Sequence, residues 1–161
     1  MSVKIEYASI AQCRLEYVWQ AFEQIELWPR WDPQAIREVR WVSGERWTKG
    51  AKFSIEMLRP LPFQRTLEVV EVETPNYVHL RGGSGVTVEQ FYLFKWMPDE
   101  QSTELRTRQE FSGGPFKLLG DSIKPTIEGG IRRLFAGVCA EAGTLTRGQD
   151  SATTQSAETG Q

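Results

Sequence analysis

The pattern of apolar and polar residues changes period along the chain. Residues 3–10 alternate, with Val3, Ile5 and Tyr7 on one face, as in a half-buried strand. From Arg14 onward an apolar residue recurs every three or four positions, namely at Leu15, Val18, Trp19, Phe22 and Ile25. The chain therefore begins with a predicted strand and continues as an amphipathic helix.

Two prolines follow that helix, in Trp28-Pro29-Arg30-Trp31-Asp32-Pro33. Proline disfavours helical backbone in the residue before it, so this segment predicts a compact turn that holds two tryptophans on a stiff loop.

Six strand-like segments come next, separated by residues rich in glycine, proline, serine and asparagine. They are residues 36–42, 51–58, 65–73, 77–81, 86–96 and 103–111. Short separators of this kind suit hairpins, so the segments predict a sequential antiparallel meander. In 86–96 both faces are apolar, so alternation alone does not decide the register. With Tyr92 and Phe94 inward, Phe91 and Leu93 lie outside and suggest a homodimer contact; the reversed register is the alternative.

A helical stripe of apolar residues runs from Leu119 to Leu145, after Gly113-Gly114-Pro115, and predicts a long C-terminal helix with Asp121 as a candidate N-cap. Gly129-Gly130 costs this helix ~1 kcal/mol per residue relative to alanine, which favours either close packing there or room for a ligand. Residues 148–161 hold no large apolar side chain and predict a disordered tail.

Composition fits one domain over residues 1–147. The chain has 161 residues, of which 40% are hydrophobic, and its net charge of -2 gives no support to nucleic-acid or anionic-membrane binding. It contains no apolar run long enough for a transmembrane helix and no signal-like N-terminus, so we expect a cytoplasmic protein. Cys13 and Cys139 lack metal-site spacing and are expected to be buried thiols, and no metal or cofactor is predicted because the chain has one histidine and no cofactor motif.

Several local motifs stand in an order that resembles a known superfamily. They are Val18-Trp19 with residues 28–33, Gly50-Ala51-Lys52-Phe53, the run at 69–75, and Thr103-Glu104-Leu105 leading to Phe111-Ser112-Gly113. Over residues 2–147 the chain resembles the START-like (SRPBCC) superfamily, which includes polyketide cyclase/dehydrase-like proteins and Bet v 1-type lipid binders. Ala11-Gln12-Cys13 departs from it, since it lacks the Pro or Ser common before the first helix.

The resemblance implies an α+β helix-grip fold. In that fold a curved antiparallel sheet of about seven strands wraps around a long C-terminal helix, with a short helical segment after the first strand and a hydrophobic cavity between sheet and helix. The residues expected to line that cavity are Phe22, Trp31, Phe53, Ile55, Met57, Tyr92, Phe94, Leu105, Thr107, Gln109, Phe111, Phe116, Ile123, Ile127 and Ile131. Trp31 and Phe116 are further hypothesised to form the two sides of an apolar gate.

Two polar groups stand out on this predicted wall. Thr107 and Gln109 alternate with apolar residues, and buried polar groups need partners. They either bond to each other or to water, or they orient the polar end of a ligand.

Three functions follow from these observations. The first is binding of a hydrophobic small molecule or lipid in the cavity. The second is a polyketide cyclase or dehydratase, for which Tyr92, His79 and Gln109 are the candidate proton-transfer or polar groups. The third is a protein-interaction domain that uses exposed Trp41 and Trp47.

Alternation places the remaining charged groups on the outer face. His79 lies between Val78 and Leu80 and is expected to face solvent. Three arginines are expected to pair there with glutamates: Arg81, Arg106 and Arg108 with Glu89, Glu104 and Glu110. If one of these arginines faced inward instead, its guanidinium would suit a carboxylate or phosphate head group.

Overall fold

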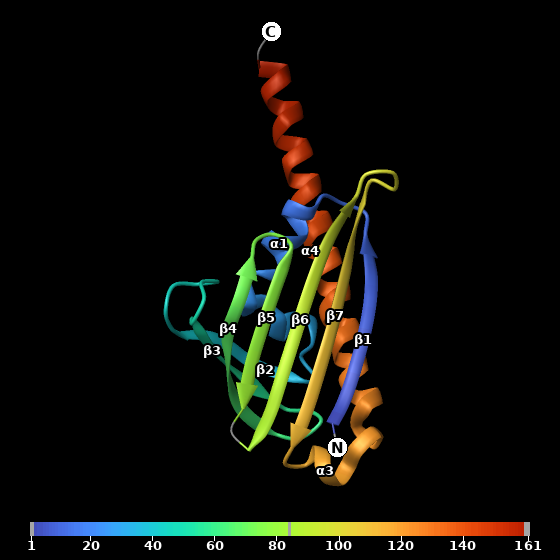
Figure 1. Ribbon diagram of the computed structural model, residues 1–161. Coiled ribbons are helices and arrows are strands. Elements are labelled where there is room, and N and C mark those ends of the chain that lie inside the picture. Colours follow the sequence, from blue (N-terminus) through green and yellow to red (C-terminus); the bar gives the residue numbers. More distant parts are fainter. Residues whose placement is uncertain (1, 84, 160–161) are drawn as a thin grey trace.

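The chain folds as a sheet whose one face is covered by a long helix (Figure 1). The computed structural model describes residues 2–83 and 85–159, and side chains as far as residue 150. The first elements are β1 (Ser2–Ala11), α1 (Leu15–Phe22), the 3₁₀ turn η1 (Ile25–Leu27) and α2 (Trp28–Trp31). The meander is β2 (Ile36–Ser43), β3 (Lys52–Met57), β4 (Phe63–Glu73), β5 (Tyr77–Gly83), β6 (Val86–Met97) and β7 (Ser102–Gly113). The chain ends with α3 (Phe116–Leu119), η2 (Gly120–Ile123) and α4 (Lys124–Thr159).

The seven strands form one antiparallel sheet in the order β1-β7-β6-β5-β4-β3-β2. Strands β2 to β7 pair with their neighbours in the chain, as hairpin signals predict, whereas β1 pairs with the last strand, for example Ile5 opposite Gln109. The sheet curves around α4, which lies behind it in Figure 1. The predicted helix-grip fold is confirmed.

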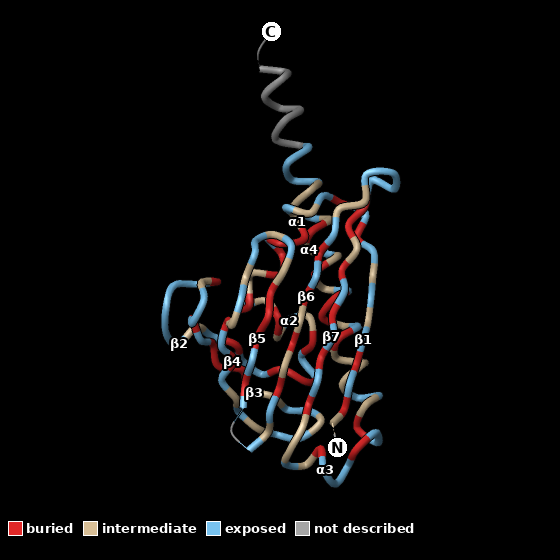
Figure 2. The backbone as a smooth tube through the Cα atoms, in the orientation of Figure 1, coloured by how far each residue is buried: buried red, intermediate tan, exposed pale blue. Residues whose placement is uncertain are grey.

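Side chains alternate between the two faces of each strand. In β6, Gln90, Tyr92 and Phe94 are buried under α4, whereas Leu93 is 48% exposed on the other face. This confirms the chosen register of 86–96. Figure 2 shows the buried positions concentrated between the strands and α4.

Aromatic rings fill the space between the sheet and the helices near α1. The ring centroid of Phe22 lies 4.8 Å from that of Tyr92, 5.1 Å from Phe94 and 5.4 Å from Trp28. The Trp28 indole donates a hydrogen bond to the Phe22 carbonyl at 3.0 Å, so the polar edge of this buried ring is satisfied. This end of the molecule is a solid core.

The structure differs from the sequence prediction at two helices. Residues 28–31 form the short helix α2 rather than a turn, because Pro29 stands in its first turn, where a missing N–H is harmless. At the C-terminus α3 and η2 precede α4; Asp121 lies in η2 and does not cap the long helix.

Disorder of the tail, residues 148–161, stays a prediction. The backbone of α4 continues to Thr159, through most of residues 148–161, while 160–161 lie outside the described residues. Extending a helix that is already nucleated adds one hydrogen bond per residue, so a polar sequence can continue it without a packing partner.

Helix α4 approaches α2 most closely at Gly137. A Cβ atom at this position would overlap the ring of Trp31. Gly130 meets both expectations for the Gly129-Gly130 pair: it borders the cavity described below, and a Cβ atom there would lie 3.2 Å from Asp32 Oδ2.

We predict that Gly137→Ala lowers the free energy of unfolding by roughly 1–3 kcal/mol, because Trp31 must move to admit the methyl group. The matched control is Gly143→Ala in the same helix, where the nearest atom to a Cβ is an Arg147 guanidinium nitrogen at 3.5 Å. The control should be neutral or stabilising, since alanine is the better helix former. Urea unfolding of both variants measures the difference, and equal effects would contradict the prediction.

Candidate functional site

A cavity lies between the sheet and the first half of α4. Its volume is about 80 Å³. Strand residues from β3, β4, β6 and β7 form its floor, α4 forms its roof, and α2, the β3–β4 connection and α3 close its sides. The lining residues are Trp28, Asp32, Ala35, Ile36, Ile55, Met57, Arg59, Pro60, Phe63, Arg65, Leu67, Gln90, Tyr92, Gln109, Phe111, Phe116, Thr126, Ile127, Gly130, Ile131 and Leu134.

About half of the predicted lining residues border this cavity. They are Ile55, Met57, Tyr92, Gln109, Phe111, Phe116, Ile127 and Ile131. The others do not: Phe22, Trp31, Phe53, Phe94, Leu105, Thr107 and Ile123. Most of these seven lie on the inner side, as predicted, but they belong to the packed core, where neighbouring side chains leave no space.

The hypothesis of a gate formed by Trp31 and Phe116 is not supported. Phe116 is 3% exposed and stacks on Phe111 at 5.3 Å between centroids, at one side of the cavity. Trp31 packs against Gly137 of α4 instead. The two rings belong to different places in the fold.

A connected set of polar side chains occupies the floor of the cavity. The Tyr92 hydroxyl donates to Gln90 Oε1 at 3.3 Å and accepts a hydrogen bond from Gln109 Nε2 at 3.2 Å. Gln90 Nε2 in turn donates to Gln109 Oε1 at 3.2 Å, and Thr107 donates to the Phe91 carbonyl at 2.8 Å. Of the two readings for Thr107 and Gln109, the structure therefore contains the one in which polar groups bond to each other.

Among the cavity residues that the sequence prediction missed, Arg65 is a charged one that points inward from the sheet. It lies on β4 with the same alternation as buried Leu67 and Val69, so its side chain enters the cavity. Its guanidinium carbon lies 5.5 Å from the ring centroid of Phe63 and 5.8 Å from that of Phe111. Its Nε is shielded from solvent and has no hydrogen-bond partner. Burial lowers the pKa of Arg65 to about 10, so the side chain is still charged at neutral pH.

The second buried charge at the cavity has a partner. Asp32 is 2% exposed, and its Oδ1 accepts a hydrogen bond from Arg133 Nε at 2.5 Å. A Cβ atom at Gly130 would lie 3.2 Å from Asp32 Oδ2, so the glycine leaves room for this ion pair beside α4.

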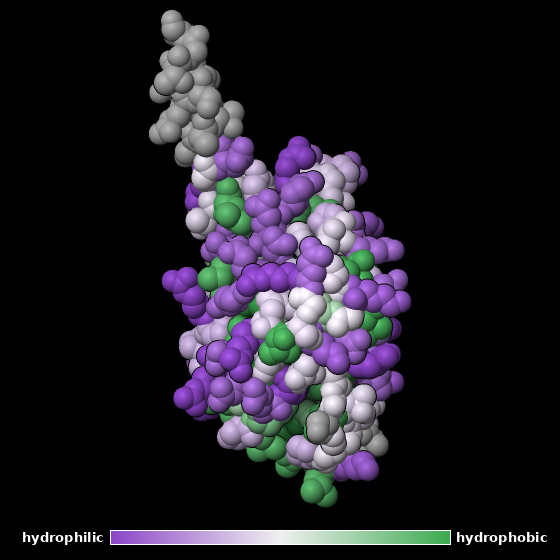
Figure 3. Space-filling model, turned by 90° about the vertical axis from the view of Figure 1, so that its left-hand side faces the viewer, coloured by the Kyte–Doolittle hydropathy of each residue, from purple (hydrophilic) through white to green (hydrophobic). Residues whose placement is uncertain are grey.

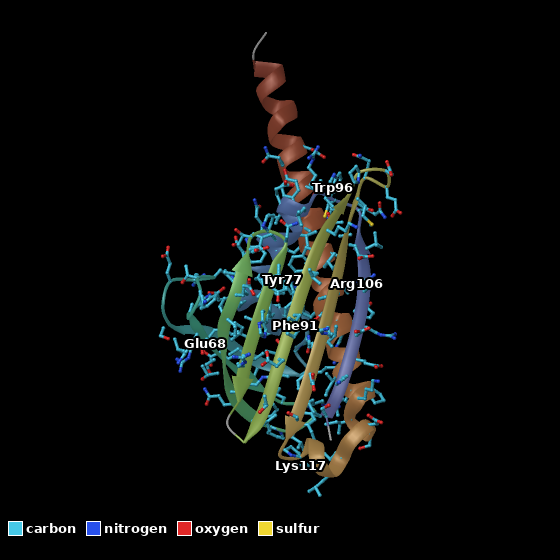
Figure 4. All side chains as sticks on the ribbon, viewed as in Figure 1. Glu68, Tyr77, Phe91, Trp96, Arg106 and Lys117 are labelled. Carbon is cyan, nitrogen blue, oxygen red and sulfur yellow. The ribbon has the colours of Figure 1, made fainter. Side chains whose placement is uncertain are left out.

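His79 lies on the outer face of the sheet, as alternation predicts, but the expectation that it faces solvent is wrong. It is 9% exposed, because its ring stacks on Phe91 at 4.2 Å between centroids and its Nε2 contacts Glu89. Figure 4 looks onto this face, where Tyr77, Phe91 and Arg106 are labelled. His79 is thus separated from the cavity by the sheet and is not brought together with Tyr92 or Gln109.

Two of the three predicted charge pairs form on this face. Arg81 Nε lies 2.5 Å from Glu89 Oε1, and Arg106 Nε lies 3.1 Å from Glu104 Oε1. Arg108 does not pair with Glu110; its guanidinium instead covers the Phe91 ring at 4.6 Å. A cation over an aromatic face is attracted by the ring quadrupole, so this arginine shields an outward apolar side chain.

Trp41 and Trp47 are not the exposed pair that an interaction domain would require. Trp47 is 8% exposed and donates to the Glu23 carbonyl at 2.9 Å. Trp41 is half-buried and packs against Trp47 and Phe53, both at 5.2 Å between ring centroids. Both tryptophans belong to the aromatic core.

Both cysteines are free. Cys13 is buried and Cys139 is half-buried, and burial raises the pKa of each thiol, which keeps the thiols protonated. Among the residues described, no group of three or more His, Cys, Asp or Glu side chains is placed to hold a metal ion.

The sequence model of one protein family, described as polyketide cyclase / dehydrase and lipid transport, matches residues 2–142. The chain belongs to this family. The match spans β1 to the middle of α4 and therefore contains the whole cavity. Among curated proteins, none matches the chain.

Solved structures show the same fold. The polyketide cyclase / dehydrase family member described here is similar to the ZhuI aromatase/cyclase of a Streptomyces species, with a TM-score of 0.72, 11% identity, and coverage of 89% of this chain and 94% of that one. It is similar to a hypothetical protein, jhp0584, of Helicobacter pylori, with a TM-score of 0.71, 18% identity and 88% coverage of both chains. Ara h 8.0201 has a TM-score of 0.71 and 11% identity, over 89% of this chain and 99% of that one. At such identities the likeness establishes the fold alone.

Over the described part of the chain, every helix is too short or too polar to cross a lipid bilayer.

We predict that Glu89→Gln makes the protein less sensitive to acid. Burial alone would raise the pKa of Glu89, but hydrogen bonds from His79 and Arg81 outweigh it and lower the pKa below its ordinary value. The ionised carboxylate therefore stabilises the fold above the unfolded-state pKa of about 4.3, and this contribution is lost as pH falls through the lower folded-state pKa. Between about pH 5 and 3, the free energy of unfolding should fall less steeply for the variant than for the wild type.

Glu38→Gln, on the exposed face of β2, is the control for this measurement and should keep the wild-type slope. An unchanged slope for Glu89→Gln, measured by denaturant unfolding across the same pH range, would contradict the prediction.

We predict that Arg65→Met stabilises the protein in the absence of ligand. The substitution removes a shielded charge that lacks a counter-ion and leaves a side chain of similar length among apolar neighbours. A gain of ~1 kcal/mol corresponds to a rise in Tm of about 2–4 °C for a domain of this size. Arg40→Met, at an exposed position of β2, is the control and should leave Tm unchanged. A fall in Tm for Arg65→Met alone would show that Arg65 serves packing.

Proposed function

We propose that this protein binds a hydrophobic small molecule in the cavity between the sheet and α4. One observation carries the proposal: the fold leaves unfilled space bordered mainly by apolar side chains, while a few polar groups gather on one wall. Ligand sites commonly combine apolar walls with a small number of placed polar groups. The family description, which includes lipid transport and polyketide cyclases, supports the same reading.

The size of the cavity limits the ligand. Its volume of about 80 Å³ is several times smaller than the ~300–1,000 Å³ of typical pockets for drug-sized molecules. A compact molecule therefore suits the cavity as it stands. A lipid requires the β3–β4 connection and α3 to move away from α4.

Exposed leucines surround these two segments. Leu118 is 90% exposed and Leu119 40% exposed at α3, and Leu61 is 39% exposed in the β3–β4 connection beside cavity-lining Pro60. Figure 3 shows apolar side chains gathered at the lower end of the molecule, where Figure 1 places α3. An apolar rim of this kind would help a hydrophobic ligand to leave water on its way into the cavity.

A cyclase or dehydratase is the second candidate, and Tyr92 is the observation that favours it. Burial raises the pKa of this hydroxyl, so the phenol keeps its proton at neutral pH and does not act as a base. To donate that proton to a substrate carbonyl, it would exchange its bond to Gln90 Oε1 for one to the substrate. The structurally similar aromatase/cyclase supports the same candidate. On this reading Gln109 orients Tyr92, and Tyr92→Phe removes turnover while it leaves ligand binding within a few-fold of wild type.

Two further expectations from the sequence concern the location and the oligomeric state of the protein. A cytoplasmic location and a homodimer formed through the outer face of β6 stay predictions. For the second, Leu93 supplies the exposed apolar surface, since Phe91 is already covered on its two sides by His79 and Arg108.

We predict that Ile127→Trp abolishes uptake of a small apolar probe such as toluene, because the larger ring fills the space that Ile127 borders. Ala136→Trp, at an exposed position of the same helix, is the matched control and should bind like the wild type. NMR chemical-shift titration measures probe binding, and native mass spectrometry of freshly purified protein, compared with a denatured and extracted sample, detects a ligand that co-purifies. A wild-type protein that neither carries a ligand nor binds the probe would contradict the proposed function.

A further inference from the structure

Inside the cavity lies one guanidinium, that of Arg65, for which the described part of the chain supplies no counter-ion. Three charged residues line the cavity: Asp32, Arg59 and Arg65. Asp32 pairs with Arg133, and Arg59 is exposed at the rim of the cavity in the β3–β4 connection. Arg65 is the one whose side-chain nitrogen is shielded without a hydrogen-bond partner.

Arg65 is half-buried, its Nε is shielded from water, and it has no ion pair, so its charge loses part of its hydration and gains no pairing energy in return. The neighbours of Arg65 do not offset this cost. Its contacts with Phe63 and Phe111 are aromatic, and the hydrogen bonds of the Tyr92 hydroxyl go to Gln90 and Gln109. The position of the Arg65 guanidinium is explained if the ligand supplies a negatively charged hydrogen-bond acceptor.

The rings also restrict how the guanidinium is presented. Phe63 and Phe111 both lie within 6 Å of the guanidinium carbon, from β4 and β7 respectively. Packed in this way, the side chain has few orientations, so little rotamer entropy remains to be lost on binding. A planar guanidinium donates two parallel hydrogen bonds most effectively to a carboxylate.

We propose that the ligand of this cavity is a compact apolar monocarboxylate whose carboxylate pairs with Arg65 while its apolar body lies against Ile55, Ile127 and Ile131. This inference rests on the proposed function and specifies its ligand. A monoanion matches the one guanidinium inside the cavity, whereas a second negative charge would have to reach Arg59, which is exposed at the rim. The charge state supports it as well, because a pKa of about 10 keeps Arg65 protonated at neutral pH.

The test compares four probes on the folded full-length protein at neutral pH. Three are of similar size, namely benzoate, its neutral isostere benzamide, and toluene, and the fourth is phenyl phosphate. Benzoate should bind at least about tenfold more tightly than benzamide, because a desolvated charge pair adds to the apolar contacts that both probes make. Phenyl phosphate, the fourth probe, should bind more weakly than benzoate. Affinities are measured by NMR titration.

Substitutions assign the preference to Arg65. Arg65→Met should bind benzoate about ten- to a hundredfold more weakly and toluene as the wild type does. Arg65→Lys keeps the positive charge but loses the paired N–H donors of the guanidinium, so its affinity for benzoate should lie between those of the wild type and Arg65→Met. Arg40→Met, on the exposed face of β2, should match the wild type for every probe. Thermal unfolding confirms that each variant is folded.

The outcomes separate the two proposals. If toluene binds and benzoate shows no advantage over benzamide, the monocarboxylate inference is overturned and the proposed function stands. If Arg65→Met retains the benzoate preference, the anion binds elsewhere and the inference is likewise overturned. If none of the probes binds the wild type, the proposed function fails and the inference fails with it. Tighter binding of phenyl phosphate than of benzoate would overturn the choice of a monoanion.

Discussion

Contact between aromatic rings of the sheet and of the helices holds the two layers of this fold together. Phe22 of α1 packs on Tyr92 and Phe94 of β6, and Phe135 of α4 lies 5.6 Å from Tyr7 of β1 and 6.3 Å from Tyr92, between ring centroids. Large rings at this end fix the spacing between sheet and helix. Toward the start of α4 the same spacing is bordered by smaller or polar side chains, such as Ile127 and Gly130, and these do not fill it. The cavity thus lies where the side chains of α4 become too small to reach the rings of the sheet, such as Tyr92 and Phe111.

Much of the fold follows from local sequence pattern. The separators between strands predict the meander, because they depend on neighbours in the chain. In β6 both faces are apolar, so the choice of Tyr92 and Phe94 as inward residues came from the resemblance to the family, and the burial pattern agrees with it. Phe53 and Leu105 show the limit of that reasoning. Both are inward, as predicted, yet neither borders the cavity. Whether an inward residue meets empty space depends on the sizes of side chains from distant strands, which periodicity does not report.

Arg65 was missed for a related reason. An arginine in a strand is ordinarily exposed, so its residue type gives no reason to include Arg65 among the cavity residues. The alternation of β4 would have indicated an inward side chain, since Arg65 stands two residues before buried Leu67 and four before buried Val69. For His79 the predicted face was right and the predicted exposure was wrong. Alternation places it on the outer face of the sheet, but Phe91 and Glu89 cover it there. Burial of a side chain by residues of a neighbouring strand depends on tertiary structure, which the local sequence pattern does not report.

The pairing of β1 with β7 has a consequence for how the chain is made. Every partner of β1, from Ser112 opposite Ser2 to Thr103 opposite Ala11, lies about a hundred residues later. During synthesis the hairpins of the meander can close as soon as each strand emerges, but the first strand must wait for the last one, with the loss of entropy that a long-range closure entails. Until β7 emerges, β1 has no strand partner, and the apolar side chains of Val3 and Ile5 stay uncovered. The first strand of this fold is therefore among the last to be protected from aggregation.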